Sequence, residues 1–176
     1  MLGSSLGAML MLAQVLLGAA NPFDTINGLP IHPLVVHMPV VLLPFSALAA
    51  IIIAFVPRWS SRFGVLVWLG AGVSLAFAFL AEKSGEALAQ RVGNPKTHAE
   101  LGEQLKYYAF GLLVVTFVLW LVDRRGGRRT LLTKLLAALV ILVALAAIWG
   151  TYRAGESGAT AVWSKIIANT PAPSAG

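Results

Sequence analysis

Four long apolar stretches, separated by short polar turns, constrain the fold of this chain more than any other feature. They cover roughly residues 34–56, 63–82, 104–122 and 131–152. At about 1.5 Å of rise per helical residue, each stretch can cross a hydrocarbon core about 30 Å thick. Lipid offers no hydrogen-bond partner to an open backbone, so each crossing stretch must be helical. The sequence therefore predicts an all-α integral membrane protein, built as a bundle of four transmembrane helices.

The composition supports a membrane protein and excludes several functional classes. Only 11% of the residues are charged, whereas a soluble domain averages about a quarter. The formal net charge of +6 would favour nucleic-acid binding in a soluble protein. Here the basic residues mostly flank apolar stretches, so we expect the lipid bilayer as partner and no nucleic acid. The chain has no cysteine, which excludes disulfides, thiolate metal ligands and thiol catalysis.

The charges of the loops predict how the bundle is oriented. The loop 57–62 carries two arginines, and the loop 123–130 carries four, with Lys134 close behind. Both loops are expected in the cytoplasm, because positive charge stays on that side of a bacterial cytoplasmic membrane. The mixed-charge segment 82–106 and the C-terminus are then expected on the extracytoplasmic side.

Residues 1–22 are expected to form a separate element ahead of the bundle. Residues 2–20 are apolar and end in small residues, as in a signal peptide, but they lack its basic start. We interpret them as an uncleaved anchor helix that spans the membrane, and the alternative is a helix in the membrane interface. The bundle is expected to occupy residues 23–164, followed by a short polar, proline-containing tail over residues 165–176.

Polar residues gather at the predicted extracytoplasmic end of the bundle. His32 and His37 lie at the outer end of the first apolar stretch, and His98 precedes the third. The other polar-site residues expected there are Ser84, Gly85, Glu86, Glu100, Glu103, Ser157 and Gly158, together with Glu156. An imidazole one turn inside the membrane is costly without a partner, so we expect His37 to contact another span. The pattern predicts a histidine–carboxylate site.

These side chains suggest two kinds of ligand. Two histidines on facing helices can hold haem b, and His37 with His98 is the expected pair. The alternative is a divalent transition metal held by His32, His37, His98 and Glu156, because imidazole suits copper, zinc and iron. His32 precedes Pro33 and would lie about 140° from His37 on a regular helix, so we expect it to matter less. Each residue also has an ordinary interpretation as a turn, capping or surface residue.

Four separated motifs resemble one bacterial membrane family. They are "FDTINGLPIHPLVVHMPVVLLP", "SGEALAQRV", "THAELGE" and "YRAGESGATAVW", in this order. Together they look like the family called domain of unknown function 2231, over about residues 23–164. The resemblance implies a compact four-span bundle, and position 156 in such proteins looks variable between histidine and an acid. It also implies that the characteristic positions of the family include His32, His37, Ser84, Gly85, His98, Glu156, Ser157 and Gly158.

Two functional hypotheses follow. The first is a site for electron transfer or metal handling at the outer end of the bundle. The second is a non-enzymatic accessory subunit of a larger membrane complex, for example a respiratory one, because small residues between 70 and 78 permit close helix contacts. A transporter is disfavoured, because the centres of the spans carry almost no ionisable residue. The sequence shows no hydrolase triad and no nucleotide-binding loop, so we assign no catalytic residue.

Overall fold

Helices make up nearly all of the chain that the computed structural model describes, which is residues 7, 9, 21–126 and 128–170. Two short strands, β1 (Thr25–Ile26) and β2 (Leu29–Pro30), come first. They are followed by α2 (His32–Val35), α3 (His37–Phe55), α4 (Pro57–Val92), α5 (Lys96–Asp123) and α6 (Leu131–Ala168). The anchor expected over residues 2–20 lies outside the described residues, apart from Gly7 and Met9.

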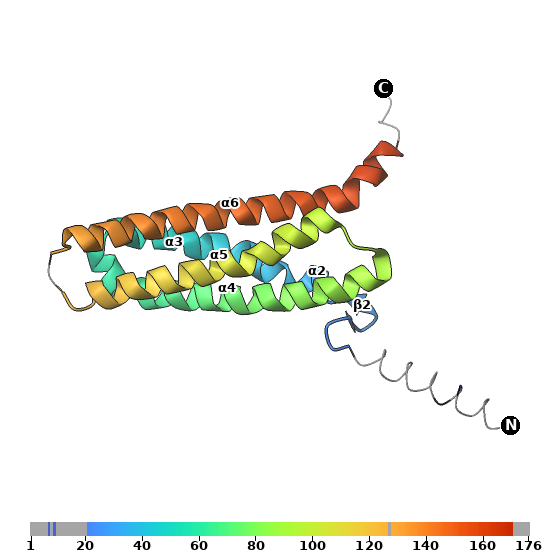
Figure 1. Cartoon of the computed structure of the whole chain (residues 1–176), viewed down its shortest axis with the longest axis horizontal. Helices are drawn as coiled ribbons and strands as arrows, with labels where there is room; N and C mark the ends of the chain where they lie inside the picture. The colour runs from blue at the N-terminus through green and yellow to red at the C-terminus, as the bar shows by residue number, and fades with distance from the viewer. Residues whose placement is uncertain (1–6, 8, 10–20, 127, 171–176) are drawn as a thin grey trace.

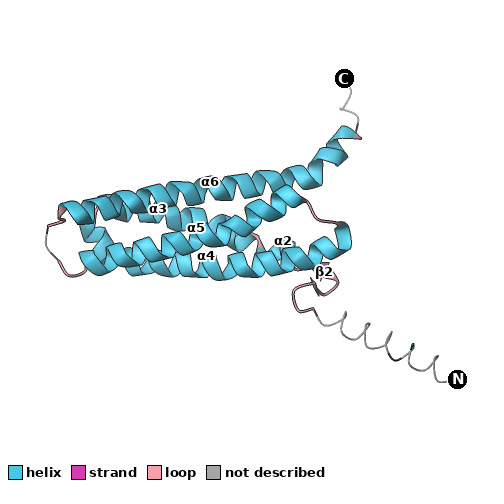
Figure 2. Ribbon diagram, viewed as in Figure 1, coloured by secondary structure: helices cyan, strands magenta, loops and turns pink. Residues whose placement is uncertain are grey.

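The long helices form an up-and-down bundle (Figures 1 and 2). Each helix packs against the next along the chain, and α6 packs back against α3 to close the ring. Four helical segments, namely α2 with α3, α4, α5 and α6, are long and apolar enough to cross a membrane. The prediction of an all-α membrane bundle with four spanning helices is therefore confirmed. α4 and α6 extend well past the apolar stretches, to Val92 and Ala168.

Small residues allow these helices to pack closely. A Cβ at Gly64 would lie 2.8 Å from a ring carbon of Trp120, and one at Gly70 would lie 2.6 Å from Ser46 Oγ. Alanines fill the centre, with Ala47, Ala50, Ala71, Ala109, Ala144 and Ala147 fully buried. Lipid gives helices no hydrophobic reason to associate, so close van der Waals contact of this kind holds the bundle together. Gly70 and the buried Ser74 and Ala78 therefore pack inside this bundle.

One end of the bundle, here called the arginine end, is fixed by a buried ion pair. Arg129 Nη2 lies 2.6 Å from Asp123 Oδ2, and the two side chains are only 9% and 4% exposed. The same guanidinium donates to the backbone carbonyls of Ile53 and Ala54 in the last turn of α3. Arg129 therefore caps α3 and ties it to the end of α5, a role that the loop charges alone did not predict.

The opposite end, here called the histidine end, begins with a tight hairpin. β1 and β2 pair antiparallel, with Ile26 opposite Leu29. Asn27 and Gly28 make the turn with φ of 51° and 80°, as a two-residue hairpin requires. α2 follows directly, and Val36, with α-helical φ of −63° and ψ of −24°, joins it to α3. The hairpin thus leads directly into the helical segment that carries His32.

Candidate functional site

His32 is anchored to α4 through one ring nitrogen. Its Nδ1 lies 2.9 Å from the carbonyl oxygen of Ala81 and 3.1 Å from Ser84 Oγ. A carbonyl oxygen only accepts hydrogen bonds, so Nδ1 carries the proton and donates it. In the neutral ring, Nε2 is then left with a lone pair. Gly85 makes room for the ring, because a Cβ there would lie 3.0 Å from His32 Cε1.

His98 is anchored to α6 in the same way. Its Nδ1 lies 3.2 Å from the carbonyl oxygen of Ala154 and 3.2 Å from Ser157 Oγ. The same argument puts the proton on Nδ1 and leaves a lone pair on Nε2. A Cβ at Gly158 would lie 2.9 Å from His98 Cε1, so this ring also rests against a glycine.

The two anchored rings lie side by side at the histidine end. Their centroids are 6.3 Å apart and their planes are inclined by 76°. Both residues are half-buried, and neither Nε2 has a hydrogen bond to any described residue. Histidines that bind metals typically donate one ring N–H to a backbone carbonyl or carboxylate while the other nitrogen faces the ion. His32 and His98 both have the first half of that arrangement.

His37 does not take part in this pair. It is exposed, and its Nδ1 is hydrogen-bonded to the carbonyl of Pro33, one turn earlier in the same chain segment. We expected His37 to face His98, but His32 occupies that position. The physical reason is helical spacing, because Val36 keeps α-helical angles (φ −63°, ψ −24°) and five residues then separate the two rings by about 140°. With His32 against α4, His37 faces away from it.

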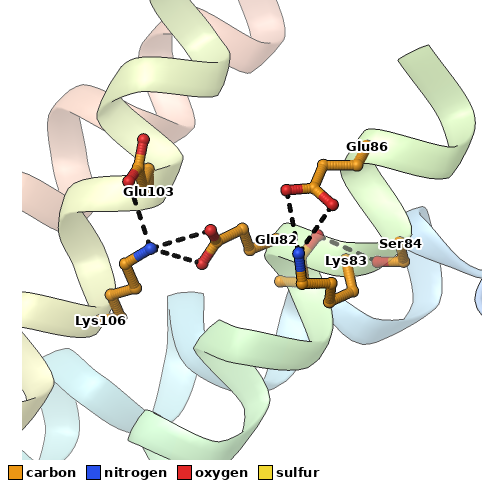
Figure 3. Close-up of polar contacts among 7 residues, drawn as sticks. Glu82, Lys83, Ser84, Glu86, Glu103 and Lys106 are labelled. Atoms are coloured by element: carbon orange, nitrogen blue, oxygen red, sulfur yellow. Dashed lines mark hydrogen bonds and ion pairs between the residues drawn. The ribbon is translucent and has the colours of Figure 1, made fainter. Parts of the chain in front are cut away.

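Three carboxylates of this end, those of Glu82, Glu86 and Glu103, pair with lysines rather than with the histidines. Figure 3 shows Lys106 between Glu82 and Glu103, at 2.8 Å and 3.2 Å. The Glu82–Lys106 pair joins α4 to α5 and is mostly buried. Glu86 pairs instead with Lys83 at 2.9 Å on an exposed face of α4. Of the acids expected in the polar site, Glu86 and Glu103 thus pair with lysines, and Glu82, which was not expected there, joins α4 to α5.

The larger metal site expected from the sequence is not assembled. Within residues 21–126 and 128–170, no group of three or more histidines and acids is placed to hold a metal ion. Glu100 is exposed, and so is Glu156. Glu156 lines a separate groove between α3 and α6, together with Val40, Pro44, Ile148, Thr151, Tyr152 and Gly155. The structure thus brings together His32 and His98, with Ser84, Gly85, Ser157 and Gly158 beside them.

A second ion pair ties the N-terminal hairpin to this end. Arg91, near the end of α4, donates two hydrogen bonds to the carboxylate of Asp24, which precedes β1. The hydrogen bond from Arg91 lowers the pKa of Asp24 below its ordinary value of 3.8. A carboxylate with a lowered pKa stabilises the folded state at neutral pH, and this stabilisation disappears as the pH falls through the lowered value. The pair thus helps to keep the hairpin against α4 at neutral pH.

The charged residues show how deep the histidine pair lies. On α4, residues 63–81 carry no charge and cover about 28 Å at 1.5 Å per residue, close to the thickness of a hydrocarbon core. Ser84 comes just past this uncharged stretch, and Ser157 comes just past Arg153 on α6. His98 lies two turns before Lys106 on α5. We therefore expect the pair at the level of the lipid headgroups, outside the hydrocarbon core.

Part of this site was not predicted from the sequence. The Ser-Gly pairs were expected at this end, but their assignment to particular histidines was not. One signal was present in the sequence, because Ala-x-x-Ser-Gly occurs at residues 81–85 and again at residues 154–158. The repeat pointed to two equivalent positions on α4 and α6, but His32 and His37 both precede the first copy, so it did not choose between them.

Comparison with known proteins gives one clear result. Neither the curated proteins nor the solved structures include a significant match to this chain. The model of one family, described as a predicted membrane protein (DUF2231), matches residues 28–171. That range contains all of α2 to α6 and both Ser-Gly motifs. The chain therefore belongs to the DUF2231 family of predicted membrane proteins, as its four motifs suggested.

Proposed function

We propose that His32 and His98 together bind one transition-metal centre at the histidine end of the bundle. The observation that carries the proposal is the pair of imidazoles, each anchored through Nδ1 and each with Nε2 available. A metal that lies in line between two Nε2 atoms makes bonds of about 2.0–2.1 Å to each of them. Because each nitrogen lies about 1.1 Å from the centre of its own ring, the two ring centres are then about 6 Å apart. The 6.3 Å between the ring centroids matches this requirement.

The ligand chemistry is that of two neutral imidazoles on one first-row metal. Imidazole suits copper, zinc and iron, and the iron is either a free ion or the centre of haem b. Two protein ligands leave further positions for water or for an exchanging partner. At the level of the headgroups, the centre is within reach of the aqueous side. These features favour electron transfer or metal handling at the extracytoplasmic surface of the bacterial membrane.

A structural accessory subunit is the second candidate, and one observation favours it. Beyond the bundle, the last turns of α6 carry an apolar stripe, with Val162, Trp163, Ile166 and Ile167 each at least half exposed. Their spacing of three and four residues puts them on one face of the helix. A stripe of this kind suits packing against other membrane subunits.

The ligand content of the purified protein tests the proposal. The full chain should be produced in cells supplied with iron, copper, zinc and a haem precursor. An absorption spectrum detects haem, and elemental analysis detects a free ion. We expect about one metal centre per chain in the natural protein. His32→Gln and His98→Gln should each lose it, whereas His37→Gln, the matched control at an exposed histidine, should retain it.

Two outcomes would reject the metal centre. One is a well-folded natural protein with neither haem nor a stoichiometric metal. The other is full occupancy in both the His32→Gln and the His98→Gln protein. The accessory-subunit hypothesis would then lead, and the two histidines would serve to join α2 to α4 and α5 to α6.

A further inference from the structure

The two anchored histidines belong to two halves of the chain that are built alike. The first half contains α2, α3 and α4, and the second contains α5 and α6. In each half, a histidine near the start donates through Nδ1 to the carbonyl of the alanine in an Ala-x-x-Ser-Gly motif on the next long helix. In each half the ring also contacts the serine and the glycine of that motif.

The likeness extends along the full length of the helices. His32 and His98 are 66 positions apart, and the same shift carries buried residues of α3 onto every buried residue of α5. These pairs are Pro39 with Leu105, Leu43 with Ala109, Ser46 with Leu112, Ala50 with Thr116, and Ile53 with Leu119. The three- and four-residue spacing of buried positions is common to the long helices, because a shift of 21 also carries these α3 positions onto Ser60, Gly64, Val67, Ala71 and Ser74 of α4. What distinguishes the shift of 66 is that it also carries His32 onto His98.

α4 and α6 agree in the same way. Ser84 and Ser157 are 73 positions apart, and this shift again carries buried residues onto buried residues. These pairs are Ser60 with Thr133, Gly64 with Ala137, Val67 with Val140, Ala71 with Ala144, Ser74 with Ala147, and Ala78 with Thr151. The helical hairpins α3–α4 and α5–α6 thus share most of their buried positions, whereas Ala47, Ala54 and Ala87, for example, have no buried counterpart.

The arrangement of the helices completes the comparison. In the ring, α3 packs on α4 and α6, while α5 packs on α6 and α4 (Figure 1). Exchanging α3 with α5 and α4 with α6 leaves every one of these contacts in place, as it does in any closed ring of four helices. The contacts of His32 and His98 with their Ala-x-x-Ser-Gly motifs go further, because they make the two histidines equivalent under this exchange. This equivalence implies an approximate two-fold axis that passes between the two rings.

We infer that this chain is an internal duplication whose two halves each supply one half of a single ligand site on the axis. The inference rests on the proposed function and deepens it. The ligand is one metal ion that the two imidazoles hold equally. Two separate ions, or one ion that depends on only one half, would not fit the equivalence of the two halves.

The test is a Zn²⁺ titration of the full chain in lipid nanodiscs, with ¹⁵N-labelled histidine observed by NMR. Substitution His37→Gln identifies the signals of the other two rings. Before Zn²⁺ is added, both rings should carry the proton on Nδ1. The Nε2 signals of His32 and His98 should then shift together and saturate at one Zn²⁺ per chain. His32→Gln and His98→Gln should each weaken Zn²⁺ binding at least about 10-fold, and by similar factors.

The outcomes separate this inference from the proposed function. Two Zn²⁺ per chain, a shift of one ring alone, or losses that differ more than tenfold would overturn the shared site and leave metal binding intact. Absence of any Zn²⁺ binding would overturn the shared site. A purified chain that also carries neither haem nor any other stoichiometric metal would reject the metal centre itself. The variants Ser84→Ala and Ser157→Ala keep both rings and provide a second test in case a histidine variant misfolds. They too should weaken Zn²⁺ binding, by similar factors.

Discussion

Glycine is required beside each histidine, because the rings lie against the helix backbone. A Cβ at Gly85 or Gly158 would come within 3.0 Å and 2.9 Å of the facing His Cε1. Real side chains avoid such contacts, so the ring would have to turn away. Turning the ring lengthens the hydrogen bond from Nδ1 to the alanine carbonyl, and this bond fixes the direction of Nε2.

We predict that Gly85→Ala and Gly158→Ala each lower the affinity for the bound metal by about 10- to 100-fold. Stability should hardly change, because alanine favours a helix over glycine by about 1 kcal/mol, which offsets part of the strain. Gly155→Ala is the matched control, since a Cβ there meets no other atom within 4 Å. Zn²⁺ titration and thermal unfolding measure the two effects. Unchanged affinity in both variants would contradict the role given to these glycines.

The membrane depth of the site residues could be predicted from the sequence, but their partners could not. Charge and hydropathy put Ser84, His98 and Ser157 at one end of the bundle, since lipid separates polar from apolar positions along each helix. Which histidine meets which serine depends on how the helices are rotated about their own axes. Because His32 and His37 lie about 140° apart on a helix, only one of them can face the bundle, and no local pattern in the sequence shows that it is His32.

The helix ends at the arginine end depend on one buried guanidinium. Arg129 reaches the carboxylate of Asp123 and two carbonyls of α3, so it satisfies groups that would otherwise stay unpaired. Removing it leaves a buried carboxylate without its partner. Breaking a buried ion pair in this way typically costs about 3–5 kcal/mol.

Arg129→Gln is therefore predicted to destabilise the bundle by about 3–5 kcal/mol, measured as unfolding in detergent. Arg128→Gln, at the exposed neighbouring position, should change stability by less than about 0.5 kcal/mol. Adding Asp123→Asn to Arg129→Gln should cost less than the sum of the single changes, because it removes the unpaired charge. Equal stability of the Arg128 and Arg129 variants would rule out the cap.

The presence of the four long helices and the positions of their ends depend on different forces. The four spans could be predicted, because a backbone in lipid must satisfy its own hydrogen bonds. Their ends could not be predicted from hydropathy, because α4 continues beyond the apolar stretch through Ser84 and Ala87, which are buried by contacts at the histidine end. The Arg129–Asp123 pair could not be predicted either, because it forms across a turn whose positive charges are already explained by a cytoplasmic loop.

The two-fold pattern of the bundle is broken at one place. The Glu82–Lys106 ion pair closes the contact between α4 and α5. At the equivalent contact between α6 and α3, the corresponding positions are Gly155 and Val40, and both line the open groove that contains Glu156. One side of the histidine end is thus closed by an ion pair, whereas the other side has an open groove. This difference distinguishes two halves whose buried faces are otherwise alike.

The orientation of the bundle decides which compartment supplies the ligand. The arginine end carries Arg58, Arg62, Arg124, Arg125, Arg128 and Arg129, whereas the histidine end mixes lysines with acids. An excess of Lys and Arg in short loops keeps those loops in the cytoplasm. The histidine end is therefore predicted to face the extracytoplasmic side, where a metal or redox partner would reach it.

Single cysteines at the two ends test this orientation without background, because the natural chain has no cysteine. Asn94→Cys lies at the histidine end and Arg128→Cys at the arginine end, and both positions are exposed. A maleimide that cannot cross membranes should label position 94 in intact cells, and position 128 only after the cells are opened. Labelling of position 128 alone in intact cells would show that the bundle has the opposite orientation. The histidine pair would then draw its ligand from the cytoplasm, and any role in electron transfer or metal handling would belong to that side.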